Sequence, residues 1–171
     1  MKTLFLLLAL VTLDATHPLH AQKQKQVKAE QLEKLFLETK TLVESNRFKI
    51  VINQVHPQNG MDVTRFNPYG EIVIEDTVAR GELPYFGLAY SLPYGAGGGI
   101  EFNGPMIEKN VKIKQKKKEK IILYRFSVRG QNDVYQMTVG IAAGGNCSVD
   151  VISNNRTHIA YSGNATAPDE E

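Results

Sequence analysis

The side chains best suited to chemistry in this sequence lie close to its C-terminus. Ser148, Asp150 and His158 have the residue types of a nucleophile, an acid and a general base. In a terminal hairpin with a three-residue loop, Asp150 and His158 are diagonal neighbours on the outward face. Neither a strand–turn–helix elbow nor a set of oxyanion-binding donors accompanies them. We therefore predict no catalytic residues and keep a hydrolase-like enzyme using His158 and Asp150 as the alternative.

The composition gives little support to metal or redox chemistry. Beyond residue 21 the sequence has two histidines, His56 and His158, and one cysteine, Cys147. A structural zinc site takes four nitrogen or sulfur ligands, and these three residues show no ligand spacing. A single cysteine also forms no internal disulfide. We predict no metal and no cofactor, and we expect Cys147, which alternates with Val149 and Val151, to be a small buried apolar side chain.

A segment rich in aromatic residues, proline and glycine is the other candidate site. It reads LPYFGLAY over residues 83–90 and LPY over residues 92–94. Proline and glycine make such a loop stiff and shaped, and its aromatic side chains have two interpretations. They either plug one end of the sheet's core or form a surface for a ligand or partner. The binding hypothesis names Tyr85, Phe86, Tyr90 and Tyr94.

The N-terminus indicates that these candidates function outside the cytoplasm. Lys2 precedes an apolar run over residues 4–13, which has the length of a signal peptide's hydrophobic region and is too short to span a bilayer. The small residue Ala21 precedes Gln22, and we predict cleavage between them. The mature chain is then periplasmic or secreted and has no membrane span; a retained N-terminal anchor is the alternative.

Charge and composition narrow the class of protein. The formal net charge of +2 is too small to predict a nucleic-acid partner. With 42% hydrophobic and 22% charged residues, the 171-residue chain has the composition of one globular domain. Lysines between residues 112 and 120 alternate at first with Val111 and Ile113. This indicates a solvated strand face that discourages edge-to-edge pairing, and an anion-binding surface is the alternative.

Hydrophobic periodicity predicts one helix followed by strands. Residues 22–45 carry apolar side chains three and four residues apart, which is typical of an amphipathic helix. After Asn46 the period changes to two, and short strands are expected at 48–52, 71–75, 100–102, 110–115, 121–129, 134–141, 147–152 and 157–161. Residues 77–81 either continue the second strand or pair beside it. In the last hairpin, a three-residue loop places Val149 opposite Tyr161 and Val151 opposite Ile159.

These elements predict the fold class. No helical pattern separates the strands, so parallel crossovers are not expected. We predict a single α+β, mostly β domain over residues 22–163. Its N-terminal amphipathic helix packs on a curved antiparallel sheet or partial β-barrel of about seven or eight strands. Residues 1–21 are the signal peptide, and residues 164–171 are a disordered tail.

Several blocks of the sequence resemble a known family. LPYFGLAY at 83–90, GIEF at 99–102, the basic hairpin and SNNRTHIAYSG at 153–163 are similar to the domain of unknown function 4251 (DUF4251) family, over residues 43–163. The resemblance implies an exported single-domain protein of Bacteroidetes and supplies no catalytic residues. Asp76-Thr77-Val78 also resembles the acceptor pattern of an O-glycosylation system of Bacteroidetes envelopes. Thr77 is therefore a candidate modification site if it faces solvent.

Together these features predict an exported binding or interaction module that is not an enzyme. Its expected partner is a small ligand or an envelope protein. The alternatives are the hydrolase-like enzyme and a purely structural envelope protein.

Overall fold

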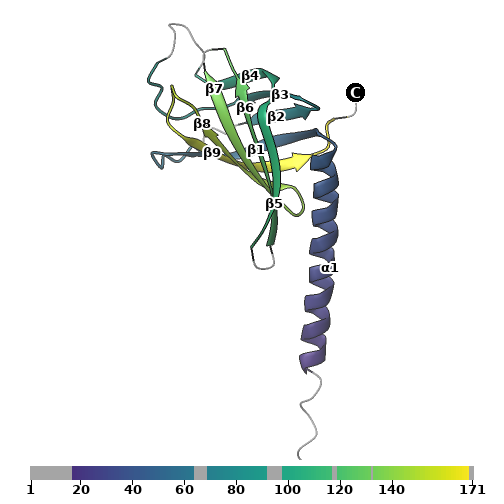
Figure 1. Cartoon of the computed structure of the whole chain (residues 1–171). Helices are drawn as coiled ribbons and strands as arrows, with labels where there is room; N and C mark the ends of the chain where they lie inside the picture. The colour runs from purple at the N-terminus through teal and green to yellow at the C-terminus, as the bar shows by residue number, and fades with distance from the viewer. Residues whose placement is uncertain (1–16, 64–68, 92–97, 117–118, 132, 170–171) are drawn as a thin grey trace, which may run out of the picture. The chain divides into compact units, whose positions relative to one another are not determined.

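A computed structural model of the chain describes residues 17–63, 69–91, 98–116, 119–131 and 133–169, which form a helix and a sheet (Figure 1). Helix α1 spans His17–Glu44. The strands are β1 (Arg47–Pro57), β2 (Gly70–Glu75), β3 (Val78–Leu83), β4 (Ile100–Pro105), β5 (Ile107–Lys116), β6 (Glu119–Arg129), β7 (Val134–Ala142), β8 (Asn146–Ile152) and β9 (Ile159–Thr166).

The strands form one antiparallel sheet in the order β4-β3-β2-β1-β9-β8-β7-β6-β5. The predicted mostly β fold with a helix on a curved antiparallel sheet is confirmed. The strand number is corrected from seven or eight to nine in the described residues. The difference arises at Val78–Leu83. Asp76, with a φ of 55°, lies in the turn that reverses the chain, so this segment pairs back on β2 as a separate strand.

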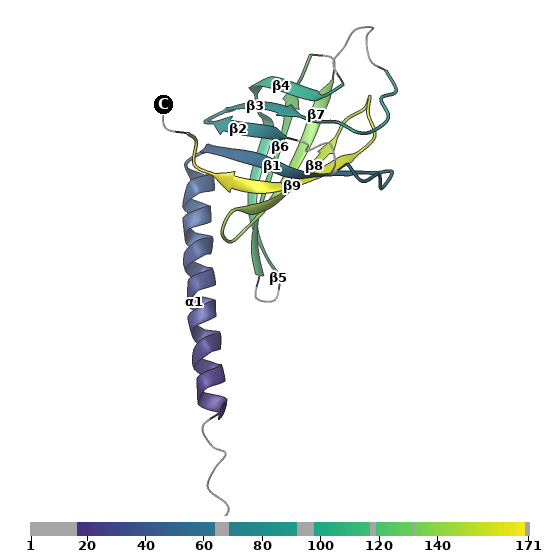
Figure 2. The same cartoon turned by 180° about the vertical axis from the view of Figure 1, so that it is seen from behind.

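The sheet is curled into a half-barrel, as Figures 1 and 2 show from opposite sides. Strands β4 and β5 lie at opposite ends of the strand order, yet only Met106 separates them along the chain. The chain therefore passes from one edge of the sheet to the other at this corner. Phe102 of β4 also forms an isolated bridge to Gly130, just beyond the end of β6. This bridge brings the β4 edge against the far side of the sheet.

Side chains on the inner face of the sheet fill its core. Alternate residues of β6 are at most 3% exposed, namely Ile122, Tyr124, Phe126 and Val128. Tyr124 packs edge-on against Phe48 of β1, with ring centroids 5.5 Å apart. The free thiol of Cys147 is 8% exposed, which confirms that this residue is a small buried side chain. The period-two pattern therefore identified the buried face of these strands.

The chain divides into two compact units, and the boundary between them lies within helix α1, between Lys34 and Leu35. In the unit that contains the sheet, Phe36 and Val43 are 4% and 2% exposed and belong to the core. Thr39 Oγ1 accepts a hydrogen bond from Gly144 N at 3.1 Å, which ties the helix to the β7–β8 turn. In the other unit, Val27 and Leu32 are 45% and 44% exposed.

The predicted signal peptide falls largely outside the described residues, because the structure describes the chain from residue 17. The backbone of α1 is helical through Ala21 and Gln22, and cleavage between them stays a prediction. No helix in the described part of the chain is both long and apolar enough to cross a membrane.

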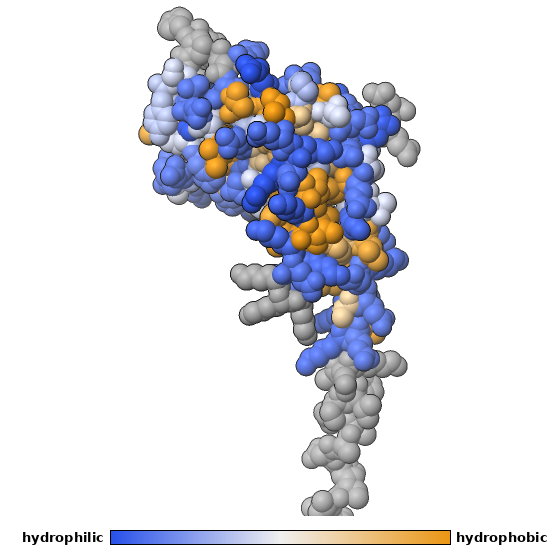
Figure 3. Space-filling model, in the orientation of Figure 1, coloured by the Kyte–Doolittle hydropathy of each residue, from blue (hydrophilic) through white to orange (hydrophobic). Residues whose placement is uncertain are grey.

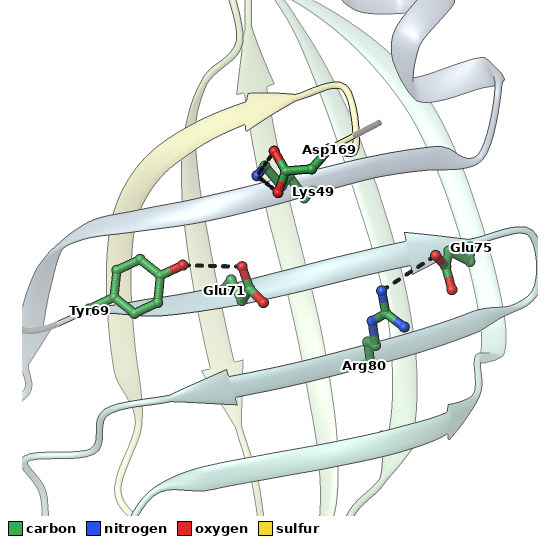
Figure 4. A network of polar contacts seen from close by, with 6 residues as sticks. All are labelled: Lys49, Tyr69, Glu71, Glu75, Arg80 and Asp169. Carbon is green, nitrogen blue, oxygen red and sulfur yellow. Dashed lines mark hydrogen bonds and ion pairs between the residues drawn. The ribbon is translucent and has the colours of Figure 1, made fainter. Parts of the chain in front are cut away.

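The last strand extends further than predicted. Strand β9 continues to Thr166, so residues 164–166 belong to the sheet and the predicted start of the tail at 164 is wrong. The reason is burial: Ala165 pairs with Ile50 of β1 and is 6% exposed. Beyond the strand, the Asp169 carboxylate forms an ion pair with Lys49 on the outward face of β1 (Figure 4). Residues 170 and 171 lie outside the described residues.

Candidate functional site

The predicted acid–base pair is present on the outward face of the last hairpin. Val149 lies opposite Tyr161 and Val151 opposite Ile159, which confirms the predicted register. His158 Nε2 lies 3.2 Å from Asp150 Oδ1, and the two side chains are 41% and 45% exposed. These two residues are therefore neighbours, as expected.

The structure does not add a nucleophile to this pair. Ser148 lies opposite Ser162, two residues along the strand from Asp150. Ser162 Oγ is 2.9 Å from Nε2 of the other histidine, His56. The outward face thus carries two separate polar pairs. Within the described residues, no group of three or more His, Cys, Asp or Glu side chains is arranged to hold a metal ion.

A separate groove of about 750 Å³ lies over the outward face of β2, β3 and β4. Its charged lining has both signs, with Glu71, Glu82 and Glu101 beside Arg80 and Arg129. Two of these side chains are already paired: Tyr69 Oη donates to Glu71 at 3.2 Å, and Arg80 lies 3.5 Å from Glu75 (Figure 4). The groove contains none of the residues predicted to form a site.

The predicted aromatic segment is more informative. Residues 84–91, called here the aromatic loop, follow β3 and lie against residues 153–158, the closing loop between β8 and β9. Leu88 N donates to Thr157 Oγ1 at 3.1 Å, and Thr157 N donates to Leu88 O at 2.9 Å. Tyr90 N donates to Asn155 O at 2.7 Å. The backbone of the aromatic loop is therefore held in one conformation by a segment about seventy residues away.

Two of the four predicted aromatic residues point inward. Tyr85 and Phe86 are partly buried against the core. The Tyr85 hydroxyl lies 2.8 Å from both Leu88 O and Thr157 Oγ1, so it joins the two loops. These two side chains have the position expected of a plug at one end of the sheet.

The outer part of the aromatic loop is different. Leu88 and Tyr90 are 70% and 69% exposed, and we call this pair the loop tip. Tyr94 lies outside the described residues. The predicted binding surface is thus divided: Tyr85 and Phe86 support the loop, and Tyr90 is displayed to solvent.

A buried arginine lies beneath the aromatic loop. Arg156 is 7% exposed, and its guanidinium carbon lies 4.9 Å from the centre of the Tyr85 ring. Its Nη1 donates to Gly98 O at 3.0 Å, while its Nε makes no hydrogen bond to the described part of the chain. Buried polar groups without partners are rare and occur at strained or functional positions.

Two further tyrosines complete the surroundings of Arg156. Burial raises the pKa of Tyr135, and the nearby positive charge of Arg156 opposes that rise. Burial also raises the pKa of Tyr161, whose hydroxyl donates to Pro84 O at 2.9 Å. The cation and the tyrosines therefore link the closing loop, the start of β7 and the aromatic loop.

Sequence reasoning missed Arg156. It placed this residue in the turn of the last hairpin, where a charged side chain is usually exposed. The aromatic segment was the sequence signal that could have indicated a buried cation, because a cation packs well on the face of a tyrosine ring. The sequence did not show which of its cations would meet that segment.

The candidate modification site, Thr77, lies in the β2–β3 turn and is exposed. Its carbonyl accepts a hydrogen bond from Met106 N at 2.8 Å, while its side chain faces solvent. The geometric condition for modification is therefore met, and the modification itself stays a prediction.

Comparison with known proteins places the chain in a family. The family model for "Domain of unknown function (DUF4251)" matches residues 30–165. The chain belongs to the DUF4251 family. A crystal structure of a DUF4251 family protein from Bacteroides eggerthii DSM 20697 has a similar fold, with 19% sequence identity and a TM-score of 0.53. The similarity covers 81% of this chain and 91% of that chain. No curated protein matches this DUF4251 chain.

The link between the two loops of this DUF4251 protein is testable with Thr157→Val. The substitution removes the hydroxyl that contacts Tyr85 and accepts from Leu88 N, and we expect a loss of about 1–3 kcal/mol in local stability. Amide hydrogen exchange at Leu88 should accelerate by at least about tenfold. Thr138→Val makes the same change on the outward side of β7 and should leave that exchange rate unaltered. Equal effects of the two substitutions would contradict the link.

Proposed function

We propose that this protein is an exported binding module that recognises a macromolecular partner through the loop tip. The observation that carries the proposal is the 70% and 69% exposure of Leu88 and Tyr90 on a loop fixed by hydrogen bonds to the closing loop. Export rests on the predicted signal peptide.

A rigid display of apolar side chains favours binding for a physical reason. Tyrosine is enriched among the residues that dominate interface energies. A loop that is already ordered loses little conformational entropy when its partner arrives. Tyr85 and Arg156 supply this order from beneath, because the cation lies against the tyrosine ring and both belong to the packed end of the sheet.

The exposure of the tip also bears on the kind of partner. A small ligand is normally enclosed in a concave pocket that covers most of its surface. Leu88 and Tyr90 protrude, so they are suited to enter an apolar depression on another protein. This favours an envelope protein over a small ligand as the partner.

The hydrolase-like alternative rests on the contact between Asp150 and His158. An aspartate that orients a histidine is one part of a hydrolytic site. Ser148 and Ser162 face each other, and within the described residues no hydrogen bond joins a serine to either member of the pair. We therefore rank this alternative below binding.

Site-specific photo-cross-linking in the native host tests the proposal. A photoreactive benzoylphenylalanine replaces Tyr90 in one strain and Tyr69 in another. Tyr69 is a matched control, because it is also a tyrosine and is 66% exposed at the start of β2. We expect a discrete adduct of one partner mass from position 90 and none from position 69. Adding Leu88→Ser should abolish the adduct.

The folded stability of the loop-tip variant separates binding from a structural role. Leu88→Ser, which should lose the adduct from position 90, should change the free energy of unfolding by less than about 0.5 kcal/mol, because the Leu88 side chain is 70% exposed. Loss of the adduct at unchanged stability supports recognition through the tip. Equal adducts from both positions, or destabilisation well beyond that limit, would reject it.

A further inference from the structure

Strand β5 is an edge of the sheet, and its backbone pairs only with β6 among the described strands. The other edge, β4, is six residues long, ends at Pro105 and forms a bridge to Gly130. Strand β5 is ten residues long. Its register is regular from Asn110 to Lys116, after a bulge at its start. An edge of this length offers a row of backbone donors and acceptors to another chain.

The two faces of this edge differ in chemistry. Val111 and Ile113 lie opposite Tyr124 and Ile122 on the inner face of the sheet. They are 43% and 49% exposed, while both partners on β6 are 1% exposed. The apolar inner face therefore continues to the edge without being covered, and Figure 3 shows hydrophobic surface over this part of the molecule.

The outward face of the same edge is basic. Lys112 and Lys114 lie opposite Leu123 and Ile121, and both lysines are exposed. Neither makes an ion pair with the described part of the chain. An added strand would therefore meet apolar side chains on one face and two unpaired cations on the other.

This pattern discriminates between possible occupants. In a dimer formed by two β5 edges, lysines would face lysines, and like charges on opposite strands repel. A segment that alternates acidic and apolar residues is complementary on both faces. Exposed charge on the outward side thus opposes self-association and attracts a strand of opposite charge.

We propose that the β5 edge accepts an extended segment of a partner protein as an additional strand, with acidic side chains against Lys112 and Lys114. Apolar side chains of the segment cover Val111 and Ile113. This site is separate from the loop tip, because the paired ends of β5 and β6 at Lys116 and Glu119 lie at the opposite end of the sheet's strands from the aromatic loop.

A synthetic probe tests this proposal on the full mature protein. The probe is a fluorescein-labelled, end-capped heptapeptide of alternating glutamate and valine, and binding is followed by fluorescence anisotropy. A lysine–valine heptapeptide is the charge control. We expect the acidic probe to bind, and the double reversal Lys112→Glu with Lys114→Glu to weaken its binding about tenfold or more. Lys25→Glu with Lys28→Glu alters the net charge equally on helix α1 and should change binding less than about twofold.

Backbone methylation shows whether the probe adds as a strand. In a strand, alternate N–H groups point in opposite directions, so only one set faces β5. One probe carries N-methyl groups on its valines and another carries them on its glutamates. Strand addition predicts that one of them loses binding about tenfold and the other does not.

Three results would overturn the proposal. The first is no saturable binding of the acidic probe up to about 1 mM, a concentration that corresponds to only about 4 kcal/mol of binding free energy. The second is equal binding of both methylated probes, since that indicates contact through charge alone. The third is binding to vesicles of anionic lipid that depends on the same two lysines, while the acidic probe does not bind.

Discussion

Replacing Gly163 with alanine is expected to lower the free energy of unfolding by about 3 kcal/mol or more. A Cβ atom at this position would lie 2.3 Å from Val51 O, 3.1 Å from Val51 C and 3.2 Å from Ile52 Cα. All three atoms belong to the backbone of β1, which does not move aside as a flexible side chain does. The clash lies on the β1–β9 pairing, where the register shifts between Ile52 and Gln54.

The position of Gly163 makes the loss large. Strands β1 and β9 are neighbours in the middle of the sheet order, and together they join the first part of the chain to the last. Separating them to admit a methyl group would weaken the pairing on which both halves of the sheet depend. We expect the urea unfolding midpoint to fall with little change in the slope of the transition.

Gly104→Ala is the matched control for this prediction. A Cβ atom at Gly104 on β4 would have Arg129 O as its nearest neighbour, at 3.9 Å, which is an ordinary contact. Both glycines lie in strands and outside the left-handed region, so neither substitution forces a strained φ. The Gly104 variant should unfold within about 0.5 kcal/mol of the native chain. Similar losses in the two variants would show that the close approach at Gly163 is not the cause.

The second large effect is a loss of stability at alkaline pH. Burial raises the pKa of the Cys147 thiol and of the Tyr124 phenol to about 12, from ordinary values of 9.0 and 10.0. Burial also raises the pKa of Tyr161. At a pH between the unfolded-state pKa and the folded-state pKa of each group, the folded state therefore retains a proton that the unfolded state has released.

The sign of the effect follows from proton binding. Below pH 9 both states hold these protons, and the groups contribute their full stabilisation. As the pH rises above 9 for the thiol and above 10 for the phenols, unfolding releases protons. Stability then falls by about 1.4 kcal/mol per pH unit for each group until its folded pKa is reached. Above pH 10, the three groups together give a slope of about 4 kcal/mol per pH unit.

Urea unfolding between pH 8 and pH 11 measures this slope. Tyr124→Phe should reduce the decline above pH 10 by one group's share, about 1.4 kcal/mol per pH unit. Tyr90→Phe removes an exposed phenol and should leave the decline unchanged. Within the described residues, the Tyr124 hydroxyl donates to Met106 Sδ alone, at 3.6 Å, so its removal disturbs little else. A native-like slope in the Tyr124 variant would contradict the assignment.

Local sequence pattern predicted a large part of the fold. Alternation of polar and apolar residues located most of the strands. It also determined the register of the last hairpin, because a slip of one residue would have exchanged the buried and exposed faces of the strand. The same register brought Asp150 and His158 together. The helix was predicted from its periodicity, and among its described side chains those that belong to the core, such as Phe36 and Val43, follow Lys34.

The pattern was less informative where a contact depends on distant parts of the chain. Residues 164–166 are polar or small and look like a tail, but the backbone of β1 pairs with them and Ala165 is buried. Arg156 looks like a turn residue, but the aromatic loop covers it. Tyr85 and Tyr90 belong to one short segment of similar residues, and the contacts of Tyr85 with Arg156 and Thr157, about seventy positions away, distinguish the inward side chain from the exposed one.

The amino-acid sequence by itself determined which segments alternate polar and apolar residues and which segments form turns. These preferences arise from steric and solvation effects within a few residues. It also determined the family, through blocks spread along most of the chain. The tertiary structure alone decided that β1 lies between β2 and β9, that β4 and β5 become the two edges, and that the aromatic loop covers Arg156. The β1–β9 pairing joins residues more than one hundred positions apart, and the aromatic loop meets Arg156 about seventy positions along the chain. Their free energy depends on how the whole sheet curls, and no local pattern contains that information.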